Sequence, residues 1–291
     1  MSRAILLSVY ILLAVTWNAL AGYAGLMSVG QQAFIGLGAY FSIRLSNAGT
    51  PVFAALVLAP LVVALISLPV SYLMLRLRGG EFAIGMWVLA FTFHLLVNLD
   101  PLIQGETGIS LIALNAFDPV TRLNSIYLMA LAAAAGVLVG MVLLLRSRFG
   151  AALQAIRDNE QAAASIGIQV FRTKQVVFVF AALGAALAGA LWLASTVSFQ
   201  PKAYFGVQWM AYTIFMVIVG GIATFEGAII GAVIFFAIEA LFGDLGLWYL
   251  IALGTTAIVC ALLFPKGIWG SLRSRYGLFL LPIGRTLSVR E

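Results

Sequence analysis

The stretch SIYLMALAAAAGVLVGMVLLL, residues 125–145, contains no charged side chain and is followed at once by Arg146 and Arg148. A helix rises about 1.5 Å per residue, so this stretch is long enough to cross the roughly 30 Å hydrocarbon layer of a bilayer. A surface helix of a soluble domain would carry polar residues along one face. Residues 125–145 therefore predict a transmembrane helix that ends at a basic boundary.

The rest of the chain has the same character. Of its 291 residues, 63% are hydrophobic and 9% are charged, and the mean hydropathy is +1.10. So few charges cannot cover a soluble domain, whereas a lipid-facing surface needs none. We expect an all-α, polytopic transmembrane bundle of about nine or ten helices that forms one domain over residues 1–291. The predicted spans lie near residues 4–21, 26–43, 52–75, 82–98, 125–145, 175–198, 203–219, 227–242 and 245–264.

Basic residues gather in the loops that follow the third, fifth and last predicted spans. They are Arg76, Arg78, Arg146, Arg148, Arg157, Arg172, Lys174, Lys266, Arg273, Arg275, Arg285 and Arg290. Because cytoplasmic loops of membrane proteins carry an excess of Lys and Arg, we expect a cytoplasmic loop at about 146–174 and a cytoplasmic C-terminus. The loop at about 99–124 has the opposite balance and is expected in the periplasm; its charged residues are Asp100, Glu106, Asp118 and Arg122.

The side of the N-terminus stays open. An unbroken second span places it outside, but the glycines between Gly22 and Gly38 could interrupt a helix and change the number of crossings by one.

The sequence lacks the residues that several kinds of chemistry require. No Gly-Lys-Ser or Gly-Lys-Thr sequence occurs, so we expect ATP to be hydrolysed by other subunits. Cys260 and His94 are the only residues of their types, which leaves no disulfide, no metal cluster and no catalytic set. We expect no enzyme activity, cofactor or metal. For His94 a hydrogen-bonded packing role is expected, with a place on a substrate path as the alternative, and Glu239 is the one acid well inside an apolar run.

The long basic loop contains the signal of a short amphipathic helix. It reads SRFGAALQAIRDNEQAAASIGI, residues 147–168. Leu153, Ile156 and Ala163 fall on one face at helical spacing. Such a helix can dock in a groove of another protein, and a solvated connector is the alternative. Glu160 interrupts the apolar row, so we expect its carboxylate to contact a basic group of the partner.

This loop resembles the cytoplasmic loop that engages the ATPase in branched-chain amino acid permeases of the LivM type. The resemblance implies a coupling role for Arg157, Asp158, Glu160, Ala163 and Gly167. Further blocks match the same family in order and cover nearly the whole chain: residues 22–40, 76–84, 220–232 and 264–270. The sequence departs from the family's usual residues at Gln31, Ala151, Ala228 and 85–87.

The glycines and polar residues of the two Gly-rich blocks also predict local structure without the resemblance. Their glycines are Gly22, Gly25, Gly30, Gly36, Gly38, Gly220, Gly221, Gly227 and Gly231. With Ser28, Gln31 and Gln32 at membrane depth, the first block indicates an interrupted or closely packed helix that lines a polar path; packing without a path is the alternative. Block 220–231 predicts a turn between two spans, with Glu226 at the start of the next helix.

The resemblance also implies the function. Members are permease subunits of ATP-binding-cassette importers in the inner membrane, and the implied partners are a homologous second permease, two cytoplasmic ATPases and a periplasmic binding protein, beside membrane lipid and without nucleic acid. The substrate would be a branched-chain or other hydrophobic amino acid, with His94 and Thr107 as further candidates for its path. Urea or a short amide is the alternative substrate. An ATP-independent secondary transporter or channel is the alternative class.

Overall fold

Long apolar helices make up most of the chain. The computed structural model describes residues 2–264 and 266–276. Within these residues, seven helices are long and apolar enough to cross a membrane: Ser2–Tyr23, Val52–Met74, Gly80–Asn98, Pro119–Arg146, Val170–Thr196, Pro201–Gly220 and Phe225–Phe242. The prediction of an all-α, polytopic bundle is confirmed.

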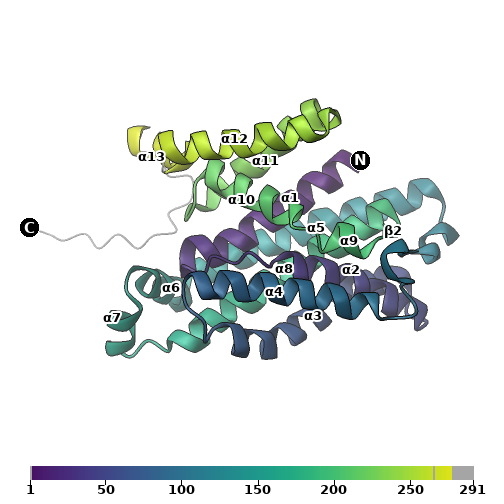
Figure 1. Ribbon diagram of the computed structural model, residues 1–291, viewed down its shortest axis with the longest axis horizontal. Helices are drawn as coiled ribbons and strands as arrows, with labels where there is room; N and C mark the ends of the chain where they lie inside the picture. The colour runs from purple at the N-terminus through teal and green to yellow at the C-terminus, as the bar shows by residue number, and fades with distance from the viewer. Residues whose placement is uncertain (1, 265, 277–291) are drawn as a thin grey trace, which may run out of the picture.

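The elements follow one another along the chain in a simple order (Figure 1). They are α1 (Ser2–Asn18) with a π-helical continuation η1 (Ala19–Tyr23), α2 (Gln32–Asn47), α3 (Val52–Met74), α4 (Gly80–Asn98), β1 (Ile109–Ser110) between 3₁₀ turns at Gly105–Thr107 and Ile112–Ala116, α5 (Pro119–Arg146), α6 (Arg148–Asp158), α7 (Glu160–Ser165), α8 (Val170–Thr196), β2 (Ser198–Phe199), α9 (Pro201–Tyr204), α10 (Gln208–Gly220), α11 (Phe225–Phe242), a 3₁₀ turn at Gly243–Leu245, α12 (Leu247–Leu263) and α13 (Gly267–Tyr276).

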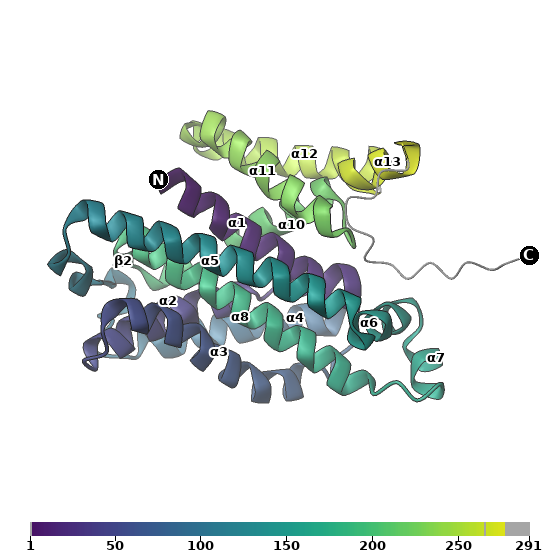
Figure 2. The ribbon, with the colours of Figure 1, turned by 180° about the vertical axis from the view of Figure 1, so that it is seen from behind.

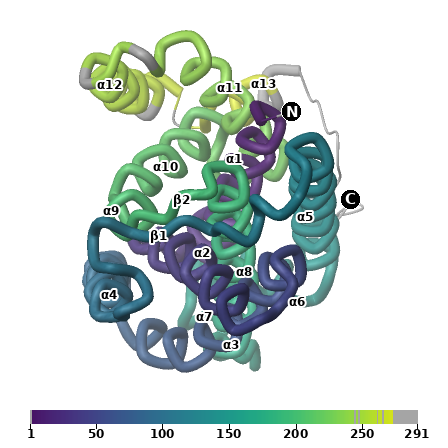
Figure 3. The backbone as a smooth tube through the Cα atoms, turned by 90° about the vertical axis from the view of Figure 1, so that its right-hand side faces the viewer, coloured from purple at the N-terminus to yellow at the C-terminus, as the bar shows by residue number. Residues whose placement is uncertain are grey.

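Helices α1 and α8 form the centre of the bundle, which Figure 3 views end-on. Residues 181–190 of α8 read AALGAALAGA, and small side chains let neighbouring backbones approach closely. A Cβ added at Gly38 of α2 would overlap the backbone of Ala186, and one at Gly189 would overlap that of Ile35. Close contact between α2 and α8 therefore depends on these glycines.

The C-terminal helices form the outer part of the molecule. Helices α10 and α11 pack against each other and against α1, whereas α12 lies mainly on α10 at the edge of the bundle (Figure 1). Of the α12 side chains that the structure describes, Tyr249 and Leu253 are buried. Most of the other described side chains of α12 are exposed and can face lipid or another subunit.

The bundle has two ends of different composition, which Figure 2 shows at opposite sides of the molecule. The α6 end, named here for the helix that covers it, holds the loops at residues 75–79, 147–169 and 221–224. The sheet end holds the antiparallel pair β1–β2 and the loops at residues 48–51, 99–118 and 243–246. The N-terminus lies toward the sheet end.

The second predicted span, 26–43, is not one continuous helix. After η1 the chain turns at Gly25, with φ +67°, has no regular secondary structure up to residue 31, and becomes helical again in α2. Buried and more exposed residues alternate along this irregular part, since Leu26, Ser28 and Gly30 are buried while Gly25 and Met27 are not. Irregular backbone thus replaces the first part of the predicted helix, before α2 begins at Gln32.

Two loop boundaries also differ from the sequence expectation. Helix α5 starts at Pro119, so residues 119–124 of the expected loop 99–124 are helical. The Asp118 carboxylate caps this helix by accepting a hydrogen bond from the Val120 amide (3.1 Å). Proline is also well suited to the first helical position, where Pro119 lies. Helix α8 begins at Val170 and shortens the 146–174 loop. Arg285, Arg290 and the C-terminus lie outside the described residues.

Candidate functional site

Helix α6 is held against the end of the bundle by its own sequence. Ser147 caps it, because the Ser147 hydroxyl accepts a hydrogen bond from the Phe149 amide (3.1 Å). Gly150, Leu153 and Ile156 form its buried face. An amphipathic helix is therefore present, and its apolar row faces this chain's own bundle. The expectation that one helix carries Leu153, Ile156 and Ala163 on a single face is wrong, because the helix is broken after α6 and Ala163 lies in α7.

Arg157 joins the last turn of α6 to the end of the first span. Its guanidinium Nη1 donates to the carbonyl oxygen of Gly22 (3.0 Å), and its side-chain carbons lie over Gly25. The carbonyls at the end of a helix lack intrahelical partners, so a cationic donor there satisfies one of them and suits the helix dipole. Asp158 extends the contact by pairing with Arg157 at 3.2 Å.

The second half of the loop forms a separate helix, α7. The chain is extended at Asn159, whose side-chain oxygen accepts from the Ala162 amide (3.0 Å) and starts the new helix. Ala163 is buried. Glu160 pairs with Lys174 of α8 (2.7 Å), so the carboxylate that we expected to reach a partner protein already has a partner within the chain.

Gly167 ends α7 in the left-handed region, at φ +87°. The Gly167 amide donates to the Ala164 carbonyl (3.0 Å) and the Ile168 amide donates to the Ala163 carbonyl (3.1 Å). This pair of bonds is the Schellman pattern that closes many helices. Gly167 therefore closes α7 in a left-handed conformation that glycine adopts without strain.

Asn18 connects the first span to the turn between α10 and α11. Its side-chain oxygen accepts from the Ala223 amide (2.9 Å), and its side-chain nitrogen donates to the Thr224 carbonyl (2.9 Å). The clamped residue Ala223 has φ +61°, a conformation that costs a non-glycine residue free energy. Gly22 lies against both partners, because a Cβ there would overlap Asn18 and Ala223.

These contacts make one continuous connection at the α6 end. It runs from α6 through Arg157 to Gly22, and from there through Asn18 to the 221–224 turn. Sequence reasoning missed Asn18, although an amide side chain inside an apolar span is itself a signal of a polar partner at membrane depth. The predicted turn at 220–231 with Glu226 in the first turn of α11 is confirmed.

The irregular segment 25–31 and the start of α2 bring polar groups into the centre of the bundle. Ser28, Gln31 and Gln32 are all buried, at 1% exposure or less. The Trp17 indole donates to the Ser28 carbonyl (2.8 Å) and the Gln31 amide donates to the Ala181 carbonyl of α8 (3.0 Å). The side-chain oxygens of both glutamines are buried without a hydrogen-bond partner, so they have acceptor capacity to spare.

His94 belongs to a polar cluster at the sheet end. Its Nε2 lies 2.8 Å from Glu106, and Glu106 also accepts from the Asn98 side chain (2.6 Å) and the Lys202 amide (3.0 Å). Partial burial acts to raise the pKa of Glu106, but the bonds from Asn98 and His94 outweigh it and hold that pKa below its usual range. Thr107 is the exposed neighbour of this cluster.

The candidate path residues do not form one contact group. Ser28, Gln31 and Gln32 lie inside the bundle, whereas His94 and Thr107 lie toward the sheet end. The Phe205 ring stacks on His94 (centroids 5.6 Å apart) and lies where a Cβ of Gly36, one turn beyond Gln32 in α2, would be.

The remaining glycines of the two blocks serve close packing. Gly30 lies against the Met86 backbone, and Gly220, Gly227 and Gly231 allow α10 and α11 to approach each other. Gly221 adopts φ +129° in the turn between these helices. Among the described residues, no group of three His, Cys, Asp or Glu side chains is arranged to hold a metal ion.

Comparison with known proteins identifies the family. The model described as "Branched-chain amino acid transport system / permease component" matches residues 2–264. The chain belongs to this permease family. LivM of Salmonella typhimurium, a high-affinity branched-chain amino acid transport system permease protein, is 27% identical over 287 residues, covering 89% of this chain and 67% of LivM. LivM of Escherichia coli K12 is 26% identical over 292 residues, covering 91% and 68%. No solved structure matches.

As a transmembrane permease of the branched-chain amino acid transport family, the chain is a transport subunit. The match covers every element from α1 to α12, so both the α6 end and the irregular segment 25–31 lie within the family region.

Proposed function

We propose that this chain is the membrane-spanning permease subunit of an ATP-binding-cassette importer, energised by separate ATPases that dock at the α6 end. The observation that carries the proposal is the placement of α6, an amphipathic helix fixed across the end of the bundle by Arg157. A helix held in this way can pass a push from a docked protein directly into the first span. A loose connector would absorb such a push.

The hydrogen bonds of Asn18 connect a movement of α6 to the start of α11. When α6 moves, Arg157 displaces the end of η1, and Asn18 carries that displacement to the turn that starts α11. The π-helical geometry of η1 leaves this last turn wider than an α-helix, and such turns often occur at functional sites. Tilting of α10 and α11 relative to α8 would then open the path alternately to each side.

The charges of the loops support one orientation. Basic side chains predominate in the loops of the α6 end, so the proposed orientation has that end, the coupling loop 146–174 and the C-terminus in the cytoplasm of a cell with an inner membrane. The 99–118 loop then faces the periplasm, where a substrate-binding protein would deliver its cargo. We assign the whole chain to one domain that pairs with a homologous second permease.

The proposed substrate is a branched-chain or other hydrophobic amino acid, in line with the printed names of the family and its relatives. Ser28, Gln31 and Gln32 supply polar groups along the path, and the buried side-chain amide oxygens of Gln31 and Gln32 have no protein partner. His94 and Thr107 lie at its periplasmic mouth. Urea or a short amide is the second candidate, favoured by the same unpaired glutamine oxygens, which could accept bonds from an amide N–H.

The coupling route can be tested in the assembled complex. We expect Asn18→Ala and Arg157→Ala to retain the co-purifying ATPases but to lower leucine uptake at least tenfold, because the push no longer reaches α10 and α11. Asn47→Ala and Arg78→Ala remove the same side-chain types at exposed sites and should transport normally. Uptake is measured in proteoliposomes with ATP inside.

Two outcomes would overturn the proposal. Leucine uptake by the isolated chain without ATP would assign it to the secondary transporters or channels. Normal uptake by both Asn18→Ala and Arg157→Ala would show that α6 is only a connector.

A further inference from the structure

Glu239 is an acid inside a membrane-spanning helix that the proposed coupling and path do not use. It lies in α11, whose other residues between 227 and 242 are apolar. Among the described residues, no basic side chain forms an ion pair with it. Ionisable groups within spanning helices are costly and usually mark a binding or transport site, so the surroundings of Glu239 matter.

Three tyrosines from three other helices gather around this carboxylate. The Tyr10 hydroxyl of α1 donates to Glu239 Oε2 (2.5 Å). Tyr10 and Tyr212 both pack on Phe235, one turn before Glu239, with ring centroids at 4.9 and 4.8 Å. Glu239 is also close enough to act electrostatically on the hydroxyls of Tyr212 and Tyr249. A carboxylate among aromatic rings is a favourable environment for an organic cation.

The Tyr249 hydroxyl is buried and has no hydrogen-bond partner. Tyr249 itself is 4% exposed and lies one helical turn from Leu253, on the buried face of α12. Buried polar groups are nearly always paired, and an exception needs an explanation such as a ligand that is bound during function. This hydroxyl is the second indication that the region receives a polar group from outside the chain.

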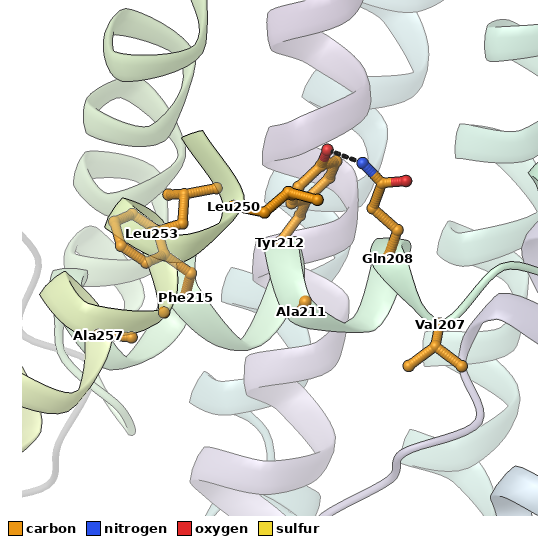
Figure 4. Close-up of a pocket in the computed structure, with 9 residues that line it drawn as sticks. Val207, Gln208, Ala211, Tyr212, Phe215, Leu250, Leu253 and Ala257 are labelled. Carbon is orange, nitrogen blue, oxygen red and sulfur yellow. Dashed lines mark hydrogen bonds between the residues drawn. The ribbon is translucent and has the colours of Figure 1, made fainter. Parts of the chain in front are cut away.

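An apolar cavity lies directly beside the cluster, between α10 and α12 (Figure 4). Its volume is about 340 Å³, and its walls include Ala211, Tyr212, Phe215, Leu250, Leu253 and Gly254. Tyr212 belongs to both the cavity and the cluster, and Gln208 donates a hydrogen bond to its hydroxyl. Small-molecule sites have this combination of an apolar body and a few polar groups at one edge.

We propose that the cavity and the Glu239 cluster form a binding site for a small ligand that joins a primary ammonium group to a short apolar body. The ammonium pairs with Glu239 beside the tyrosine rings, and the apolar body lies between α10 and α12. Where the ligand also carries a carboxylate, the free Tyr249 hydroxyl donates to it. A hydrophobic amino acid has all three groups; its identification as the natural ligand rests on the proposed function.

This site is distinct from the path residues in segment 25–31. Those residues are buried against α1, α4 and α8, whereas the cavity opens between α10 and α12. Because α10 ends and α11 starts at the turn that Asn18 clamps, a ligand here would be sensitive to the position of that turn.

The first test uses two analogues of leucine, each lacking one charged group. Radiolabelled 3-methylbutylamine is bound to the purified chain in lipid nanodiscs, and unlabelled 4-methylpentanoate is added as competitor. We expect saturable amine binding that Glu239→Gln weakens at least tenfold and that the carboxylate analogue does not displace. Glu81→Gln removes an exposed acid at the start of α4 and should bind the amine normally. Equal binding by Glu239→Gln and the unmodified chain would overturn the proposal.

Two further variants separate the site from general damage to the fold. A Cβ at Gly254 or at Gly136 meets no atom within 4 Å, but only Gly254 lines the cavity. Gly254→Leu should abolish amine binding, and Gly136→Leu, on the exposed surface of α5, should not. Tyr249→Phe should weaken leucine binding at least threefold and leave 3-methylbutylamine binding unchanged, because the amine has no carboxylate.

The same preparations distinguish the two proposals. In one outcome, ATPases co-purify and support leucine uptake, but neither Glu239→Gln nor Gly254→Leu changes amine binding. The proposed binding site is then wrong and the importer function stands. If no ATPase is recovered but amine binding depends on Glu239 and Gly254, the site stands and the importer function is wrong.

Discussion

Gly167 shows how a single residue can fix the geometry of the coupling loop. Its φ of +87° is open to glycine and strained for other residues, and the space around its Cα is empty. The cost of a side chain there is therefore conformational, not steric contact with a neighbour. The chain direction between α7 and α8 depends on this one conformation.

We predict that Gly167→Ala destabilises the loop by roughly 1–2 kcal/mol, the usual cost of a left-handed alanine. Gly167→Val should cost more because a β-branched side chain is stiffer. Both variants should insert into the membrane, while recovery of the ATPases with the chain falls in the order Gly, Ala, Val. Ala164→Val, in the neighbouring exposed turn of α7, is the control, and an equal loss of recovery there would contradict the explanation.

At the same scale, Gln31 and Gln32 differ in what they already bind. The Gln31 amide nitrogen donates to Ala181, while the side-chain oxygens of both residues are unpaired. Gln31 therefore combines a structural bond with a free acceptor.

We predict that Gln32→Leu impairs leucine uptake at least fivefold with normal membrane insertion, because it removes a free acceptor at little insertion cost. Gln31→Leu should in addition lower thermal stability, since it leaves the Ala181 carbonyl without this donor. Insertion, melting temperature and uptake are measured on the same membranes. Normal uptake by Gln31→Leu, Gln32→Leu and Ser28→Ala together would leave only a packing role for the segment.

At the scale of elements, the contact between α7 and α8 depends on one ion pair. Lys174 is nearly buried, with 11% of its side chain exposed, and Glu160 is 40% exposed. The pair ties the start of α7 to the start of α8, so it holds the loop that we assign to ATPase docking. A solvent-exposed ion pair contributes up to about 1 kcal/mol to stability. Two like charges at positions 160 and 174 would instead repel each other and weaken the packing of α7 on α8.

A charge exchange separates this internal role from a contact with the ATPase. We predict that Glu160→Lys lowers ATPase recovery and that the double variant Glu160→Lys, Lys174→Glu restores most of it, because the double variant rebuilds the pair in reverse. Glu81→Lys, in the first turn of α4, controls for added positive charge at this end of the bundle. If the double variant recovers no ATPase, Glu160 acts on the partner directly, as the sequence alone suggested.

The arrangement of the whole molecule depends on how many times the chain crosses. The interrupted second span still returns the chain to the sheet end, because α2 ends near the loop that holds Asp100: Tyr40 donates to Asp100 (2.7 Å) and Arg44 pairs with it (2.9 Å). Burial acts to raise the pKa of Asp100, but the bonds from Tyr40 and the Leu102 amide hold that pKa below its usual range. The N-terminus and the 99–118 loop therefore share one end.

We predict that cysteines at Ser2 and Thr107 react with an impermeant thiol reagent from one side of the membrane and a cysteine at Gln161 from the other. All three positions are exposed. The experiment uses a Cys260→Ser background, because Cys260 is the one native thiol. Labelling of Thr107→Cys and Gln161→Cys from the same side would reject the proposed orientation. Labelling of Ser2→Cys and Gln161→Cys from the same side would reject the crossing of the membrane by segment 25–47.

The sequence by itself determined that the chain is a multi-span helical membrane protein. The length of each apolar stretch and its lack of charge are local properties, and they decide whether that stretch is stable in the hydrocarbon layer. It also predicted the amphipathic helix of α6, since amphipathic spacing acts within a few residues, but not the break that puts Ala163 in the separate helix α7. Resemblance to known permeases supplied the family, which the family match confirms.

Only the tertiary structure decided which polar groups meet. Asn18 binds residues 223–224, Glu160 binds Lys174 instead of a partner protein, and Glu239 meets Tyr10 from the first helix. The break in the helix at segment 25–31 was likewise undecided, because glycine permits a break without requiring one. Such pairings depend on which helices become neighbours, and hydrophobic burial in lipid does not specify that choice. Small residues such as Gly38 and Gly189 specify it through close packing that only the assembled bundle reveals.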